Sequence, residues 1–209
     1  MVSNILFLVS VCLVCFGYIY VFVQFLTTSS ISDKTSFDVA KEISDGGDSI
    51  NIVSSSDVIF SEYDVKRNVI RLKSKVYDSS KVSDIANGAM LAGYSLVNQE
   101  CSDYFKFSFI ISRINLFGFV GLLGVVLSYF IRNIGDAYIG IVIFGIMIIY
   151  QYMRYQISVL ADGKIKEILD WNIYSKLSRN ISSVVLFNKV SFIVMLILVI
   201  RLVVIILGM

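Results

Sequence analysis

The chain has 209 residues, of which 56% are hydrophobic, and its mean hydropathy is +0.78. Soluble globular domains are about 45–50% apolar, so this composition indicates a membrane protein. The 18 basic and 16 acidic residues leave a net charge of only +2, which argues against nucleic-acid binding, because such proteins carry a clustered basic excess. The absence of histidine excludes Ser–His and Cys–His catalytic pairs.

Four apolar segments are predicted to cross the membrane as helices, because at 1.5 Å per residue each spans about the ~30 Å hydrocarbon core. We expect the first to be a retained anchor in which Cys12 and Cys15 are small hydrophobes rather than redox or zinc residues. Arg201 lies near the end of the last segment, where its long side chain can reach the headgroups. The segments are Ile5–Leu26, Ile114–Ile131, Ala137–Met153 and Val190–Gly208.

Most of the lysines and arginines lie in or beside two polar regions, 27–113 and 156–189. The positive-inside rule therefore predicts that both regions are cytoplasmic. The expected fold is a mainly α-helical polytopic membrane protein with about four transmembrane helices and a small α+β cytoplasmic element. The expected domains are an anchor at 1–26, an α+β region at 27–113, a transmembrane hairpin at 114–155, a cytoplasmic helical segment at 156–189 and a last transmembrane helix at 190–209.

Within the first polar region the sequence predicts two helices and a hairpin. Ser36 is the expected N-cap of a short helix, and Ser79 or Ser80 that of a longer helix from 81 to about 99. Between them, strands 58–60 and 68–72 are expected to pair around a turn at 64–67. The second polar region is helical in period until Asp170.

Two strings carry a resemblance to a known family: "YDVKRNVIRL" (Tyr63–Leu72) and "AMLAGYSLVNQE" (Ala89–Glu100). With the order of apolar segments around them, the chain from about Phe37 to its C-terminus resembles the membrane-bound neutral zinc metallopeptidases, often called YugP-like. The resemblance implies a zincin-like domain in which helix 81–100 carries H-E-x-x-H. In that motif two histidines bind zinc and the glutamate activates the metal-bound water, while a later helix supplies a third ligand.

The residues required for that chemistry are absent from the matching positions. The two histidines correspond to Met90 and Tyr94, the catalytic glutamate to Leu91, and the third ligand to Ser158. A thioether is a poor zinc ligand, leucine accepts no proton, and a phenol ionises only near pH 10. The resemblance thus implies a degenerate site with no catalytic residue, no metal and no cofactor.

Other family features are retained, namely Gly93 in the zinc helix and Ala161 and Asp162 after the third-ligand position. They suggest a binding groove formed by Gly93, Tyr94 and Asp162. The chain is therefore expected to be a catalytically inactive metallopeptidase homologue, a pseudoprotease. It would bind a partner membrane protein or an active protease paralogue in the bacterial cytoplasmic membrane, surrounded by lipid.

Three alternatives remain open from the sequence. A zinc peptidase with an atypical metal site would have to use carboxylates and a thiol, with Glu100, Cys101, Asp103 and Asp162 as the candidates. A purely structural membrane assembly subunit would have no substrate groove. A transporter component would need intramembrane charges, for which Arg201 is the available residue.

Overall fold

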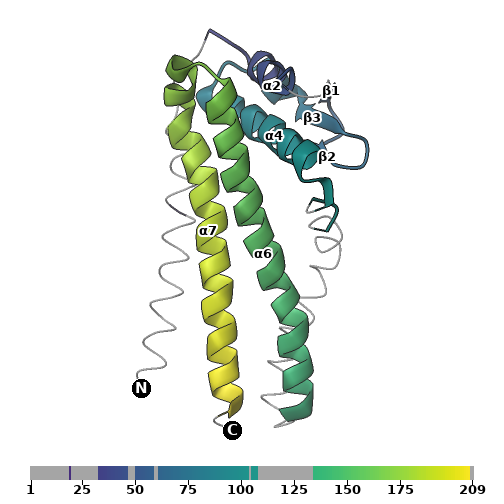
Figure 1. Cartoon of the computed structure of the whole chain (residues 1–209), viewed down its shortest axis with the longest axis vertical. Coiled ribbons are helices and arrows are strands. Elements are labelled where there is room, and N and C mark those ends of the chain that lie inside the picture. The colour runs from purple at the N-terminus through teal and green to yellow at the C-terminus, as the bar shows by residue number, and fades with distance from the viewer. Residues whose placement is uncertain are drawn as a thin grey trace. The chain divides into compact units, whose positions relative to one another are not determined.

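The computed structural model describes residues 19, 33–46, 50–58, 61–103, 105–107 and 134–207. In this part the chain is mostly helical with one small sheet (Figure 1). The helices and strands are α2 (Ser36–Ser44), β1 (Asn51–Ser55), β2 (Glu62–Asp64), β3 (Val69–Lys73), α3 (Ser74–Tyr77), α4 (Val82–Glu100), α6 (Ile134–Ile168) and α7 (Trp171–Leu207).

Helix α2 begins with a capping box one residue before the predicted N-cap. The Asp38 backbone N–H donates to Thr35 Oγ1 at 3.2 Å, and the Thr35 N–H donates to Asp38 Oδ2 at 2.9 Å. Such reciprocal bonds satisfy two helix N–H groups that lack partners. The prediction of Ser36 as the cap is therefore wrong by one residue. Ser36 is instead fully buried, and its hydroxyl donates to the carbonyl oxygen of Asp84 in α4 at 3.0 Å.

The sheet has the strand order β1-β3-β2, with β1 parallel and β2 antiparallel to β3. The predicted hairpin is present, but its first strand is β2 rather than 58–60, of which only Val58 is described. Its turn is fixed by Asp64 Oδ1, which accepts from the N–H groups of Lys66 and Arg67 at 3.0 and 3.2 Å. Asn68 follows with a φ of 53°, a left-handed conformation that asparagine tolerates. Strand β1 was not predicted.

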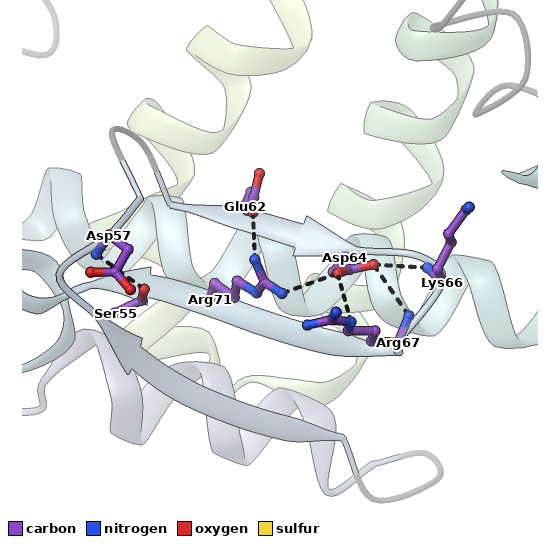
Figure 2. Close-up of polar contacts among 7 residues, drawn as sticks. All are labelled: Ser55, Asp57, Glu62, Asp64, Lys66, Arg67 and Arg71. Carbon is purple, nitrogen blue, oxygen red and sulfur yellow. Dashed lines mark hydrogen bonds and ion pairs between the residues drawn. The ribbon is translucent and has the colours of Figure 1, made fainter.

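The sheet has one face toward the helices and one away from them. Alternation along β3 buries Ile70 and Leu72 completely, whereas Arg71 lies on the opposite face. There Arg71 forms ion pairs with Glu62 at 3.5 Å and Asp64 at 3.3 Å, as Figure 2 shows. The inner face packs with α2 and α4 around the core residues Val39, Ile43, Ile85 and Ala89.

The predicted helix from 81 to about 99 is α4, but no side-chain hydrogen bond caps it at Lys81. Ser79 nonetheless secures the first turn, since its hydroxyl donates to Asp84 Oδ2 at 2.5 Å. Helix α6 ends at Ile168, close to the predicted end at Asp170.

The described residues form two compact units. One contains α6 as far as Tyr155 and α7 from Phe187. The other contains the sheet, α2, α3, α4, α6 from Gln156 and α7 as far as Leu186. The second unit thus joins two stretches that are far apart in the sequence.

The predicted polytopic fold with about four transmembrane helices is wrong. Among the described residues, one helical stretch, Trp171–Ile197 in α7, is long and apolar enough to cross a membrane. The predicted segments 5–26 (apart from Ile19) and 114–131 lie outside the described residues, and 137–153 is part of α6. The prediction used the length of each apolar run. That length is the same whether the residues of the run face lipid or protein. Even in α7, the residues Leu177 and Ile181 belong to the protein core.

By length and composition, the stretch Trp171–Ile197 of α7 is the one among the described residues that could cross a membrane. In the 18-residue window that meets this criterion, 22% of the residues are buried, whereas the core helix of a soluble protein is mostly buried. The stretch begins at Trp171, well before the predicted start at Val190, because α7 continues without a break from the protein core.

Candidate functional site

Helices α4 and α6 are in close contact at Gly93. A Cβ atom at Gly93 would lie 3.0 Å from Ile165 Cδ1 and 3.1 Å from both the Cβ and the carbonyl oxygen of Ala161. A side chain would therefore fit only if α6 shifted by a few tenths of an ångström. The two helices approach this closely because residue 93 has no side chain.

Of the positions that the resemblance aligns with the zinc motif, Met90 lies one turn before Gly93 on the same helix face. Met90 is 2% exposed and Leu91 7% exposed, while Tyr94 is half-buried against the core. On α6, Ser158 is fully buried and shares a helix face with Ala161, three residues further on. The structure thus brings the face of α6 that carries Ser158 and Ala161 to the face of α4 that carries Met90 and Gly93.

The side chains at this interface do not fit a zinc ion. Met90 and Leu91 offer no imidazole, thiolate or carboxylate, which are the usual zinc ligands. Within the described ranges, no group of three His, Cys, Asp or Glu residues is arranged to hold a metal. Ser158 and Tyr94 each have an interaction partner, so neither is a free polar group in the interface.

The carboxylates proposed as substitute ligands are engaged elsewhere. Asp162 Oδ1 accepts a hydrogen bond from the hydroxyl of Tyr174 at 2.9 Å. Asp103 is 99% exposed and lies 3.6 Å from Lys106, and Cys101 is exposed. These groups do not converge on one point.

Glu100 instead joins the end of α4 to α6. Its Oε1 lies 2.7 Å from Lys164 Nζ, which also lies 3.5 Å from Glu167. The hydrogen bond to Glu100 raises the pKa of the Lys164 ammonium group. Because Glu100 is more than half exposed, this pair orients the helices rather than stabilising them strongly.

A second polar cluster, centred on Tyr63, was missed by sequence reasoning. The Tyr63 hydroxyl donates to Asn68 Oδ1 at 2.7 Å and accepts from Asn98 Nδ2 at 2.8 Å. Burial raises the pKa of Tyr63, and the hydrogen bond from Asn98 opposes that shift. The cluster ties the β2–β3 hairpin to α4. The one sequence feature that could have drawn attention to this cluster was the position of Asn98, one turn after Tyr94 on α4.

Comparisons of the chain with protein-family models, with curated proteins and with solved structures found no match. The family resemblance in the two strings therefore stays a prediction, as do the roles of Gly93, Tyr94 and Asp162 as a groove.

Proposed function

We propose that the chain is a catalytically inactive relative of the membrane zinc metallopeptidases that acts by binding a partner membrane protein or an active protease paralogue. The observation that supports the proposal is the close contact between α4 and α6 at Gly93, one turn after Met90. Gly93 lies against Ala161, and the face that carries Ser158 meets the helix that carries Met90. A two-helix zinc site would likewise need these two helix faces to lie close together.

The absence of catalytic chemistry follows from the side chains at these positions. No group at Leu91 can take a proton from water, and the interface is filled by buried apolar side chains. A close interface without metal-binding or catalytic groups supports a role in binding.

For its location, we propose an integral protein of the bacterial cytoplasmic membrane whose polar regions face the cytoplasm. The apolar stretch of α7 supports membrane association. The orientation rests on the concentration of lysine and arginine in the regions 27–113 and 156–189.

Site-specific photocrosslinking in native membranes tests the binding role. A photoreactive phenylalanine at Tyr94 or Asp162 should crosslink a discrete partner, identifiable by mass spectrometry. The matched control is the exposed α6 residue Lys166, where the same probe should yield none. Equal crosslinking at all three positions would contradict the proposal. Stoichiometric zinc in the purified protein would instead favour the peptidase with an atypical site.

A structural assembly subunit is the second candidate, because the α4–α6 interface is tightly closed at Gly93 and Ser158. Such a protein would use its outer surface, where Val159 and Leu160 are 39% and 47% exposed on α6. Crosslinks from Val159 and Leu160, with none from Tyr94, would favour this second function.

A further inference from the structure

The exposed face of α7 changes from partly polar to apolar just after Lys189. Exposed residues recur every three or four positions along the helix, as expected for one face. Up to Lys189 they include the polar residues Arg179 and Ser182. Beyond Lys189 every described exposed side chain is apolar, and these residues are Ile193, Leu196, Ile200 and Val204.

Among the described residues, the first exposed cation of α6 lies at the same level. Its exposed residues Val142 and Ile149 are apolar, followed by the exposed Tyr152 and then by Arg154. The ring centres of Tyr152 and Phe192 lie 5.3 Å apart, and this contact fixes the register between the two helices in this unit.

Both cations lie just beyond this ring contact on the side toward the α6–α7 connection. Arg154 is two residues from Tyr152 and Lys189 is three residues from Phe192, or about 3 and 4.5 Å along the helix axes. The two charges therefore lie at nearly the same position along the helix axes, next to the exposed apolar residues of the two helices.

Neither cation is neutralised within the described part of the chain. No carboxylate of the described residues lies within 4 Å of Arg154 or Lys189, although both side chains are exposed. Helix α7 contains four basic residues and no acidic residue. The Arg154 guanidinium lies 5.8 Å from the centre of the Tyr150 ring, a cation–π contact that holds it on the tyrosine-bearing surface.

We propose that Arg154 and Lys189 bind the phosphate of anionic phospholipid headgroups, with Tyr150 and Tyr152 at the membrane–water interface. The charge of such lipids is complementary to the two cations, and their acyl chains match the apolar surface around Ile193. Tyrosine is enriched at this depth of a membrane, and basic side chains next to it contact headgroups. The proposal also sets the depth of α7, because lipid contact begins just after Lys189 rather than at Trp171.

Lipid binding to the full-length protein in detergent tests the site. Phosphatidylglycerol and phosphatidylcholine are titrated separately, and bound lipid is counted by native mass spectrometry. A basic residue at an anionic surface contributes about a fivefold affinity. We therefore expect Arg154→Gln and Lys189→Gln each to weaken phosphatidylglycerol binding about fivefold, and the double variant about 25-fold, with no effect on phosphatidylcholine.

The matched control is Arg179→Gln, which removes an exposed cation from the same face of α7 ten residues earlier. This variant should bind phosphatidylglycerol like the wild type. An equal loss in the control, or no loss in the double variant, would overturn the proposal. Inorganic phosphate should not displace the lipid at equal concentration, and displacement would show a site for free phosphate instead.

A fluorescence experiment tests the depth independently. Trp171 is the only tryptophan in the chain and lies 18 residues before Lys189, about 27 Å along α7. In vesicles with brominated acyl chains its emission should be unquenched, whereas a tryptophan at Ile193 in a Trp171→Phe background should be quenched. Quenching of Trp171, or no quenching at position 193, would overturn the proposed boundary.

Discussion

Replacing Gly88 by alanine should destabilise the protein, although alanine is the better helix former. An ideal Cβ at Gly88 would lie 2.3 Å from Ser36 Oγ and 3.0 Å from the Ser36 carbonyl oxygen. Relief of that overlap costs about 1–3 kcal/mol in a packed core. Displacement of the Ser36 hydroxyl from its hydrogen bond to Asp84 adds about 1 kcal/mol. The higher helix propensity of alanine returns about 1 kcal/mol.

The expected net loss is therefore about 2 kcal/mol, which lowers the melting temperature by about 4–8 °C for a chain of this size. Thermal denaturation of the full-length protein, followed by circular dichroism, measures it. The matched control is Gly163→Ala in α6, where the added Cβ would meet no atom of the described residues within 4 Å outside its own helix turn. That variant should instead gain about 1 kcal/mol from helix propensity.

A double variant separates the clash from other effects. Ser36→Ala removes the atom closest to the new methyl group, so Ser36→Ala/Gly88→Ala should be less destabilised than the sum of the two single variants. If Gly88→Ala were as stabilising as Gly163→Ala, the close packing of α2 on α4 would be refuted.

Three further predictions concern the polar groups. Tyr63→Phe should cost about 1–2 kcal/mol, because it leaves two hydrogen-bonding partners unsatisfied. Burial raises the pKa of Tyr63, so its stabilising effect should disappear as the pH rises above about 10, and urea denaturation at pH 8 and 10.5 measures that difference. Hydrogen bonds from Thr35 lower the pKa of Asp38. The wild type should therefore be more stable than Asp38→Asn at neutral pH, and an acid titration should show this advantage vanish below about pH 4. Lys164→Met should reduce stability slightly at low ionic strength and not at 1 M salt, because its pair with Glu100 is partly exposed and screened.

The local elements near the sheet were largely predictable from sequence, because their signals are local. A hydrogen-bonding side chain before a helix and a turn sequence between apolar residues determine α2 and the β2–β3 hairpin to within a few residues. Strand β1 gave no such signal, because its partner is the parallel strand β3, whose pairing depends on contacts distant in the sequence. Asn98 was missed for the same reason, since its bond to Tyr63 joins residues 35 positions apart.

The membrane prediction failed for a different physical reason. Hydropathy reports how apolar a run is, and not what surrounds it. In α7 the buried residue Leu177 and the exposed residue Ile193 belong to one apolar stretch, yet the first lies in the protein core. At the candidate site, by contrast, the spacing of Met90, Gly93 and Tyr94 was sufficient to place them on one helix, whereas the contact with Ala161 required the structure.

The most direct test of the central claim is to rebuild the zinc site. The full-length variant M90H/L91E/Y94H/S158E restores the implied ligands and base, and its zinc content is measured by elemental analysis after dialysis. The matched control M90H/L91E/Y94H/V159E shifts the last ligand onto the exposed face of α6. Circular dichroism verifies the fold of each variant, and M90H/Y94H/S158E is the fallback if a buried glutamate at 91 prevents folding.

If the α4–α6 interface is a former metal site, the rebuilt variant should bind about one zinc per chain. Zinc at a hundredfold excess over its Kd should then stabilise that variant by about 2.7 kcal/mol, seen as a higher melting temperature. The wild type and the shifted control should bind none. A folded rebuilt variant that retains no more zinc than the control would contradict the account.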